Sequence, residues 1–331
     1  MIEKKLSIGI DISKLTLDIC IIDDDVLENY CIKNKVTSIR SFVKKLKKKF
    51  GVAELELCME NTGLYNWPLY SVCEELSITA YVINPLHLKR SMGLVRGKND
   101  KIDAERIALH ARRFYDTLTP YKLPSKTIRK MQIMYALRKR IVEVKKMFNA
   151  PISELKSVAE KGVYAEMLKI TNQLVKQLDN KLLRVEEELN SLITSDAQIQ
   201  ENYKLITSVQ GVGKVLAWNL LIKTNNFKTI NDPRKLACYV GVVPFDFQSG
   251  TSINKKPRVS FMADKQVKKV LHMAALRAVR LEGDLQKYYL RKVAEGKNKM
   301  SVLNAVRNKI IARVCSVVNN KKMYETNLVL L

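Results

Sequence analysis

The order of apolar segments in the first 115 residues limits the folds that this chain can adopt. Three short apolar runs, at 6–12, 15–22 and 30–32, follow one another with only a few residues between them. This spacing predicts an antiparallel meander, because closely spaced strands pair with their neighbours. After the meander we expect a helix, a strand, a helix and a strand, at 38–50, 55–59, 64–75 and 78–83.

Three strands, a helix, a strand, a helix and a strand form the order of a ribonuclease-H-like sheet. We therefore predict an α/β domain of that type at 1–120. The rest of the chain has mainly helical patterns, so the predicted fold class is α/β plus α. We expect it to comprise a helical region at 121–200 and a small, mainly helical domain at 201–331.

The region 126–200 has the pattern of two long helices with a break at 149–151, where the sequence is Asn-Ala-Pro. Proline favours a break because it lacks a backbone N–H and clashes with the preceding turn. In the second helix, apolar residues recur in steps of four or three: Leu174, Leu178, Leu182, Val185, Leu189 and Leu192. This near-heptad seam suits a coiled coil between two chains and, equally well, a helix packed within its own chain.

The last part of the chain contains two glycines between two helical segments. Gly211 and Gly213 separate the run 205–209 from a helix that starts near Lys214. The pattern suits a helix-hairpin-helix, whose exposed backbone N–H groups can bind a nucleic-acid phosphate. A helix cap with tight packing explains the glycines equally well. Farther on, apolar residues along one side of 299–319 predict a basic helix docked on the core.

Four acidic residues occupy positions that need an explanation. Asp11 lies within an apolar strand, and Glu60 follows directly on another strand that is its neighbour in the predicted sheet. Asp100 and Asp103 are three residues apart at the start of a helix, which places them on one helical face. A carboxylate in apolar surroundings is costly unless a cation meets it.

The four carboxylates predict a site for Mg²⁺ or Mn²⁺, because these hard cations prefer oxygen ligands. Two such ions about 3.5–4 Å apart can hold a phosphodiester. Each residue also has a simpler explanation: Asp11 as a turn residue, Glu60 as a helix cap, and Asp100 and Asp103 as charges at a helix start. The four together, in this fold order, favour the metal site.

The chain is strongly basic, with 58 Lys and Arg against 33 Asp and Glu and a formal net charge of +25. A surplus of this size favours an anionic partner, and nucleic acid is the usual one. A generally basic soluble protein is the simpler alternative. The hydrophobic fraction of 47% is enough to build buried cores, which excludes disorder throughout the chain.

Cysteine and histidine do not suggest a second kind of metal site. The six cysteines are scattered singly, without a Cys-x-x-Cys pair, and the three histidines are isolated. This usage predicts buried thiols in a reducing compartment. The charged N-terminus is unlike a signal peptide, and no apolar stretch reaches about 20 residues. We expect a soluble cytoplasmic protein with no membrane partner.

Several motifs resemble those of the DEDD transposases of the bridge-RNA-guided insertion sequences, which are related to the Piv-type DNA invertases. In the N-terminal half the matching segments are GIDISK at 9–14, ENTGLY at 60–65, VINP at 82–85 and KNDKIDA at 98–104. In the C-terminal half they are VQGVG at 209–213, LACYVGVVP at 236–244 and QSGTS at 248–252. The resemblance spans nearly the whole chain, with the motifs in the same order.

The resemblance implies a RuvC-like N-terminal domain, a helical coiled-coil linker and a compact C-terminal transposase domain. It implies that Asp11, Glu60, Asp100 and Asp103 bind divalent metal, and that Ser249 attacks DNA to form a covalent phosphoserine link. It also implies a structured guide RNA as partner, and a homo-oligomer, a dimer or tetramer, whose active sites combine domains from different protomers.

Ser249 is also a credible nucleophile on chemical grounds. It precedes Gly250, and a glycine lets the backbone approach DNA closely. A serine hydroxyl needs a base or a metal to activate it, and a polar turn explains the same residues. Ser252 and Ser260 are the alternatives in this region.

We therefore predict a prokaryotic, nucleoid-associated transposase that cuts and rejoins donor and target DNA. A structure-specific endonuclease of the RuvC type, in which water attacks, is the first alternative, and a non-catalytic nucleic-acid-binding scaffold is the second. The candidate contacts to nucleic acid are Gly211, Gly213, Lys214, Lys255, Lys256 and Arg258.

Overall fold

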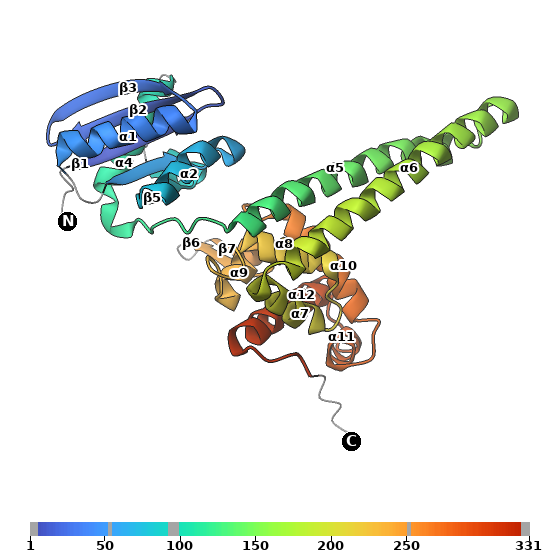
Figure 1. The fold of residues 1–331 in the computed structure, drawn as a ribbon. Helices are drawn as coiled ribbons and strands as arrows, with labels where there is room; N and C mark the ends of the chain where they lie inside the picture. Colours follow the sequence, from blue (N-terminus) through green and yellow to red (C-terminus); the bar gives the residue numbers. More distant parts are fainter. Residues whose placement is uncertain (1–5, 52–54, 92–98, 250–252, 326–331) are drawn as a thin grey trace. The chain divides into compact units, whose positions relative to one another are not determined.

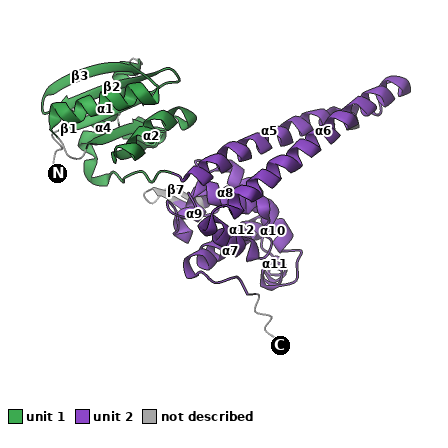
Figure 2. Cartoon of the chain, in the orientation of Figure 1, with its two compact units in different colours: residues 1–123 green, residues 124–331 purple. Residues whose placement is uncertain are grey.

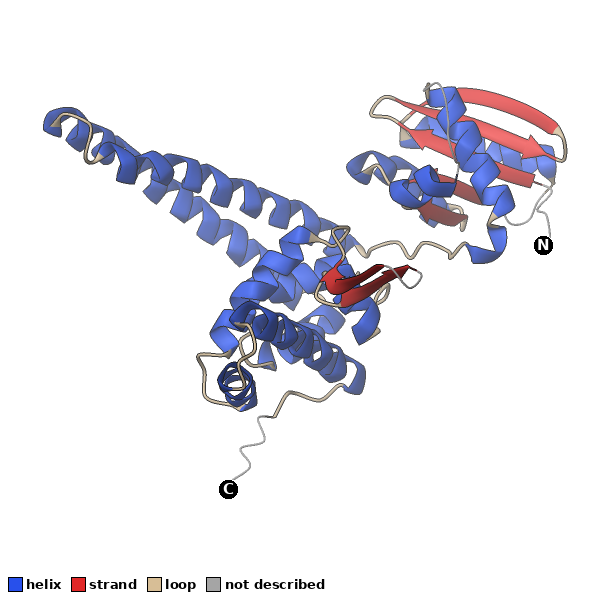
Figure 3. Cartoon of the chain, turned by 180° about the vertical axis from the view of Figure 1, so that it is seen from behind, coloured by secondary structure: helices blue, strands red, loops and turns tan. Residues whose placement is uncertain are grey.

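The computed structural model describes residues 6–51, 55–91, 99–249 and 253–325 (Figure 1). The chain forms two compact units, residues 1–123 and 124–331 (Figure 2). The first unit is a sheet with helices, and the second is mainly helical (Figure 3). Within the described residues, no helix is both long enough and apolar enough to cross a membrane.

The first unit contains a five-stranded mixed sheet. Its strands are β1 (Leu6–Ile12), β2 (Thr16–Asp23), β3 (Val26–Lys33), β4 (Glu56–Glu60) and β5 (Thr79–Ile83). They lie in the order β3-β2-β1-β4-β5, with the first three antiparallel and β4 and β5 parallel to β1. This is the order of a ribonuclease-H-like sheet, so the predicted fold of the N-terminal domain is confirmed.

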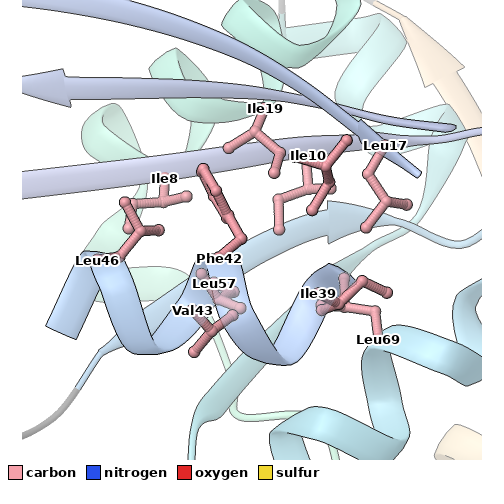
Figure 4. Close-up of a pocket in the computed structure, with 11 residues that line it drawn as sticks. Ile8, Ile10, Leu17, Ile19, Ile39, Phe42, Val43, Leu46, Leu57 and Leu69 are labelled. Carbon is pink, nitrogen blue, oxygen red and sulfur yellow. The ribbon is translucent and has the colours of Figure 1, made fainter. Parts of the chain in front are cut away.

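The helices of this unit follow the predicted alternation. They are α1 (Val36–Phe50), α2 (Trp67–Glu75), α3 (Pro85–Ser91) and α4 (Asp100–Arg113), with short 3₁₀ turns at Gly63–Asn66 and Tyr115–Thr117. On one face of the sheet, alternate residues of β1 pack against the apolar side of α1 (Figure 4). The space between them is only about 10 Å³ and its lining is apolar, so this face is a closed core.

The opposite face of the sheet is covered by α4. Ala104 and Ala108 of α4 pack with Cys20 and Ile22 of β2. Farther along the same helix, Ile107 and Ala111 pack with residues of β4 and β5. The sheet is therefore buried on both faces. Helix α4 also contacts β1.

The second unit consists of a long helical hairpin and a helical core. Its helices are α5 (Lys126–Leu155), α6 (Lys161–Thr194), α7 (Ala197–Ser208), α8 (Lys214–Lys223), α9 (Pro233–Tyr239), α10 (Lys265–Ala278), α11 (Asp284–Ala294) and α12 (Lys299–Asn320). Trp218 of α8 is fully buried at the centre. The predicted basic helix at 299–319 is confirmed, because α12 buries Val302, Val306, Ile310 and Val314.

The predicted helix break at 149–151 is wrong. Helix α5 continues through Pro151 and ends at Leu155. Pro151 is exposed and lies little more than one turn from the helix end, so its missing N–H costs a single hydrogen bond at a solvated position.

Helices α5 and α6 lie side by side in both views (Figures 1 and 3). Ion pairs join them, Arg138 with Glu186 at 2.8 Å and Lys145 with Asp179 at 2.5 Å. Val185, Leu189 and Leu192 of the seam are buried in the core of their own unit, whereas Leu174 is exposed. The C-terminal half of the seam is thus used within the chain.

The C-terminal part also contains a two-stranded antiparallel sheet that the sequence did not predict. Strand β6 (Pro244–Ser249) pairs with β7 (Ile253–Val259), with Ser249 opposite Ile253. The polar residues around Ser249 suggested a turn, and the structure places Ser249 at the end of strand β6.

Candidate active site

The position of α4 on the sheet is set by Gly9. A Cβ atom at Gly9 would overlap the backbone of Ala104 and Ala108, so the helix and β1 approach each other at backbone distance. Only glycine permits this contact. Asp11 lies two residues farther along β1 and therefore points to the same face of the sheet as Gly9. The close approach thus places the start of α4 on the face that carries Asp11.

Asp11 is half-buried, and its pKa is raised to about 6. Burial is the main cause, and the negative charges of Asp103, Asp100 and Glu60 follow, in that order. The other three carboxylates predicted from the sequence are therefore near enough to Asp11 to raise its pKa. Burial, reinforced by these three charges, makes Asp11 retain its proton at a pH where an exposed aspartate has lost it.

Glu60 is held at the end of β4 by the turn that follows. The buried Asn66 donates a hydrogen bond to the Glu60 carbonyl oxygen at 2.9 Å. Its own side-chain oxygen accepts hydrogen bonds from the backbone N–H and the hydroxyl of Thr62, at 2.9 and 2.5 Å. The segment Glu60–Asn66 is thus a fixed turn that follows directly on β4.

Asp100 and Asp103 lie in the first turn of α4, as predicted. The side chain of Asn99 caps this helix by accepting from the backbone N–H of Ile102 at 3.0 Å. Asp103 accepts a hydrogen bond from Arg106 at 2.7 Å, and both side chains are largely buried. Arg106 therefore supplies positive charge directly beside the acidic cluster.

Asp18 is an acidic residue near this site that the sequence reasoning missed. It lies directly opposite Asp11 on β2, and directly opposed residues of an antiparallel pair share a face. Its hydrogen bond and its charge raise the pKa of Cys31, after the larger effect of burial. Asp18 is an acid inside the otherwise apolar run 17–22, and that was the signal that could have identified it.

The donor set suits a divalent cation. Four carboxylates supply oxygen ligands, and a bound cation would offset the burial and the nearby negative charges that raise the pKa of Asp11. In the described part of the chain, no three Asp, Glu, His or Cys side chains converge closely enough to form a ready-made metal site. The acidic side chains would therefore have to draw together around an ion.

The residues proposed for nucleic-acid contact in the second unit have different surroundings. Gly211 has a positive φ of 87°, and a Cβ there would lie 2.7 Å from the carbonyl oxygen of Ala274. Gly213 is the N-cap of α8, and Lys214 forms an ion pair with Glu186 at 2.6 Å. Gly211 thus agrees with the tight-packing part of the alternative, and Gly213 with the helix-cap part.

The β6–β7 hairpin contains the proposed nucleophile and three of the basic candidates, which are Ser249, Lys255, Lys256 and Arg258. The backbone register pairs Phe247 with Lys255 and Phe245 with Arg258. Ser252 lies outside the described residues, and Ser260, which follows β7, accepts a hydrogen bond from the backbone N–H of Met262 at 3.2 Å. The sequence of β7, the strand paired with the one that contains Ser249, is therefore basic.

Two family models match this chain. Residues 8–156 match the DEDD-type model of IS110 elements, described as "Transposase", and residues 203–290 match "Transposase IS116/IS110/IS902 family". The chain belongs to the IS110 family of transposases. As such it is a DNA recombination enzyme of the transposase and DNA invertase group, with DNA as its substrate, and the predicted family is confirmed.

The transposase is similar in sequence to proteins of related function over almost its whole length. The pilin gene-inverting protein of Moraxella bovis is 22% identical over 98% of this chain and 99% of its own length. The transposase for insertion sequence element IS1111A of Coxiella burnetii is 23% identical over 96% of this chain and 90% of its own length. Among solved structures, RuvC of T. thermophilus in complex with Holliday junction substrate is 14% identical, with a TM-score of 0.30, over 36% of this chain and 100% of RuvC.

Proposed function

We propose that this transposase cuts and rejoins DNA strands with divalent metal held by Asp11, Glu60, Asp100 and Asp103, and with Ser249 as the nucleophile. The observation that carries the metal half is the raised pKa of Asp11, about 6, caused by burial and by the other three carboxylates. Carboxylate oxygens gathered in a partly buried site are the ligands that a divalent cation prefers, and a bound cation would offset the cost of ionising Asp11.

Each element of the first unit has a role in this site. Strand β1 holds Asp11, the fixed turn at Asn66 orients Glu60, and α4 brings Asp100 and Asp103 to the same face. Arg106 keeps Asp103 oriented when no ion is present. When bound, Mg²⁺ or Mn²⁺ would activate the attacking oxygen and stabilise the leaving one.

In the serine half of the proposal, a Ser249 hydroxyl oxygen forms a bond to phosphorus. The deoxyribose oxygen leaves with the electrons of the broken P–O bond and gains a proton, and the serine loses one. A serine–DNA phosphodiester thus replaces a DNA phosphodiester, and the reverse attack by another strand's hydroxyl rejoins the DNA without an external energy source. The position of Ser249 at the end of β6, next to a basic strand, supports this role.

We propose further that a structured RNA from the element selects the DNA and that the transposase acts as a homo-oligomer. The net charge of +25 supports a second nucleic-acid partner beside DNA. If base pairing reads the target, the protein has to recognise only the shape and charge of the paired strands.

The test is a search for a covalent protein–DNA adduct. The transposase is incubated with Mg²⁺, the RNA of its element and a DNA substrate, and the products are separated on a denaturing gel. We expect an adduct that is lost in Ser249→Ala and retained in Ser252→Ala and Ser260→Ala. We expect Asp11→Asn and Asp103→Asn, checked for folding by circular dichroism, to form no adduct.

Each alternative gives a different result. Cleavage that survives Ser249→Ala would indicate a RuvC-type nuclease in which water attacks. Cleavage that is unchanged in Asp11→Asn would contradict the metal site. Nucleic-acid binding with neither adduct nor cleavage, under conditions in which an active relative cleaves, would indicate a scaffold.

A further inference from the structure

The second unit contains a basic groove between the β6–β7 hairpin and helices α10 and α12. The groove has a volume of about 850 Å³, which lies in the range of ligand sites. Its cations are Arg258 of β7, Lys268 of α10 and Arg307 of α12, and its polar groups include Ser301, Asn304 and Asn308 of α12. None of the described residues that line it is acidic.

Arg307 is the exceptional residue of this groove. It is only 7% exposed, and its Nε atom is buried without a hydrogen-bond partner among the described residues. Burial lowers the pKa of Arg307. A buried guanidinium without a counter-ion is strongly unfavourable, since its charge loses the solvation of water and gains nothing in exchange. Such a residue is expected where an anionic ligand supplies the missing partner.

Lys268 lines the same groove, and it also lacks a negatively charged partner among the described residues. No ion pair or side-chain hydrogen bond joins it to any residue in the described part of the chain, and its Nζ atom lies near Gly241. Burial, and then the charge of Arg307, lower the pKa of Lys268. The nearest acid on its helix, Asp264, forms an ion pair with Lys223 at 2.9 Å instead. Two cations thus repel each other across a groove that holds no acidic side chain.

His272, one turn farther along α10, also lies near Arg307 and has an unsatisfied buried atom. Its Nδ1 atom is buried without a partner among the described residues. Burial, and again the charge of Arg307, lower the pKa of His272. The imidazole therefore stays neutral near Arg307, and the two cations are left for the ligand.

We propose that this groove binds a backbone phosphate of a nucleic-acid strand, with Arg307 and Lys268 as its principal ligands and Arg258 at its edge. A guanidinium can donate two parallel hydrogen bonds to phosphate oxygens, and an ammonium adds a point charge. Ser301, Asn304 and Asn308 provide hydroxyl and amide groups for the same strand. Arg258 belongs to β7, and β7 pairs with the strand that ends at Ser249. A phosphate bound here would therefore contact the hairpin that contains the proposed nucleophile.

This inference rests on the proposed function in one respect, that the bound strand belongs to a recombination substrate or its guide. Its test does not depend on catalysis. Binding of the full-length protein to labelled DNA and RNA duplexes of one sequence is measured by fluorescence anisotropy in EDTA, at several salt concentrations. The assay contains no free divalent ion and needs no cleavage, so failure of the catalytic proposal leaves this test intact.

We expect Arg307→Met and Lys268→Met each to weaken binding about tenfold, the usual effect of losing a charge-assisted hydrogen bond. The slope of log K against log salt should fall by about 0.7–0.9 for each lost phosphate contact. Lys269→Met is the matched control, because Lys269 is the exposed neighbour of Lys268 on α10 and does not line the groove. It should change binding less than twofold.

The same variants test the stability argument. Arg307→Met should unfold at the same or a higher temperature than the wild type, because it removes an unpaired buried charge. Sulfate, a phosphate analogue, should raise the melting temperature of the wild type more than that of Arg307→Met.

Loss of binding to DNA alone, to RNA alone or to both supports the groove and identifies the strand. Wild-type affinity in a folded Arg307→Met or Lys268→Met, or an equal loss in Lys269→Met, would overturn it.

Discussion

Gly9 of β1 and Ala108 of α4 are in backbone contact, with no room for a side chain between them. Almost one hundred residues separate them in the chain. Their contact fixes the helix that carries Asp100 and Asp103 at one height above the strand that carries Asp11. The geometry of the acidic cluster therefore depends on a residue that has no functional group.

Replacement of Gly9 by alanine should destabilise the first unit by about 1–3 kcal/mol, the cost of inserting a methyl group into a closed contact. It should also reduce DNA cleavage, because α4 must shift relative to Asp11. Urea denaturation measures the first effect and a cleavage assay the second. Gly162→Ala is the control, since a Cβ at Gly162 meets nothing within 4 Å and alanine is the better helix former. Equal stability of Gly9→Ala and the wild type would contradict the close packing.

Asp11→Asn should stabilise the metal-free protein at pH 7.5 while removing activity. The pKa of Asp11 is about 6 in the folded state against an ordinary 3.8, so its ionisation opposes folding. The stability it contributes is complete below pH 3.8 and is lost as the pH rises through 6. With allowance for solvent screening, the gain at pH 7.5 is roughly 1–2 kcal/mol.

Thermal melts in EDTA at pH 4 and pH 7.5 provide the measurement, and the stabilisation should be confined to the higher pH. Added Mg²⁺ should raise the melting temperature of the wild type and have little effect on Asp11→Asn. A variant less stable than the wild type at pH 7.5 in EDTA would contradict the raised pKa of Asp11.

Arg106→Met should increase Mg²⁺ affinity by about threefold to tenfold. Arg106 donates to Asp103 at 2.7 Å and so competes with an ion for that carboxylate. Isothermal titration calorimetry with MgCl₂ measures the change, with Arg113→Met as control because Arg113 is an exposed residue of the same helix. Weaker Mg²⁺ binding in Arg106→Met would mean that the pair orients Asp103 for the ion and does not compete with it.

Glu186→Ala should destabilise the second unit by about 2–3 kcal/mol. Glu186 is buried on α6 and accepts hydrogen bonds from Arg138 at 2.8 Å and Lys214 at 2.6 Å. Its removal leaves the largely buried Arg138 without this partner. Glu187→Ala, at the exposed neighbouring position, should change stability by less than about 0.5 kcal/mol. Chemical denaturation of the two variants gives the comparison.

The contribution of Glu186 should also depend on pH. Burial alone would raise the pKa of Glu186, but the hydrogen bonds from Lys214 and Arg138 outweigh it and hold the pKa below 4.5. The stability that the pair confers is therefore complete above pH 4.5 and is lost as the pH falls through the lowered value. The difference between the wild type and Glu186→Gln should narrow in acid. A difference that does not change with pH would rule out this ionic origin.

The sequence predicted the order of strands and helices in the first unit and the four carboxylates, because both depend on local patterns. Apolar periodicity identifies a strand or a helix, and an acid inside an apolar run stands out without any knowledge of its neighbours. Local patterns also gave two errors. The proline at 151 predicted a break that α5 does not have, and the polar residues around Ser249 concealed a hairpin.

The tertiary structure alone decided the contacts between distant segments. It placed Asp18 opposite Asp11 and packed α4 against Gly9. It also left Arg307 and Lys268 on one groove without an acidic partner among the described residues. Burial and charge compensation depend on which side chains contact one another in the folded protein. The spacing of residues in the sequence does not specify these long-range contacts. The sequence by itself thus determined which residues could perform chemistry in this transposase. Packing decided which of them lie together and which charges still lack a partner.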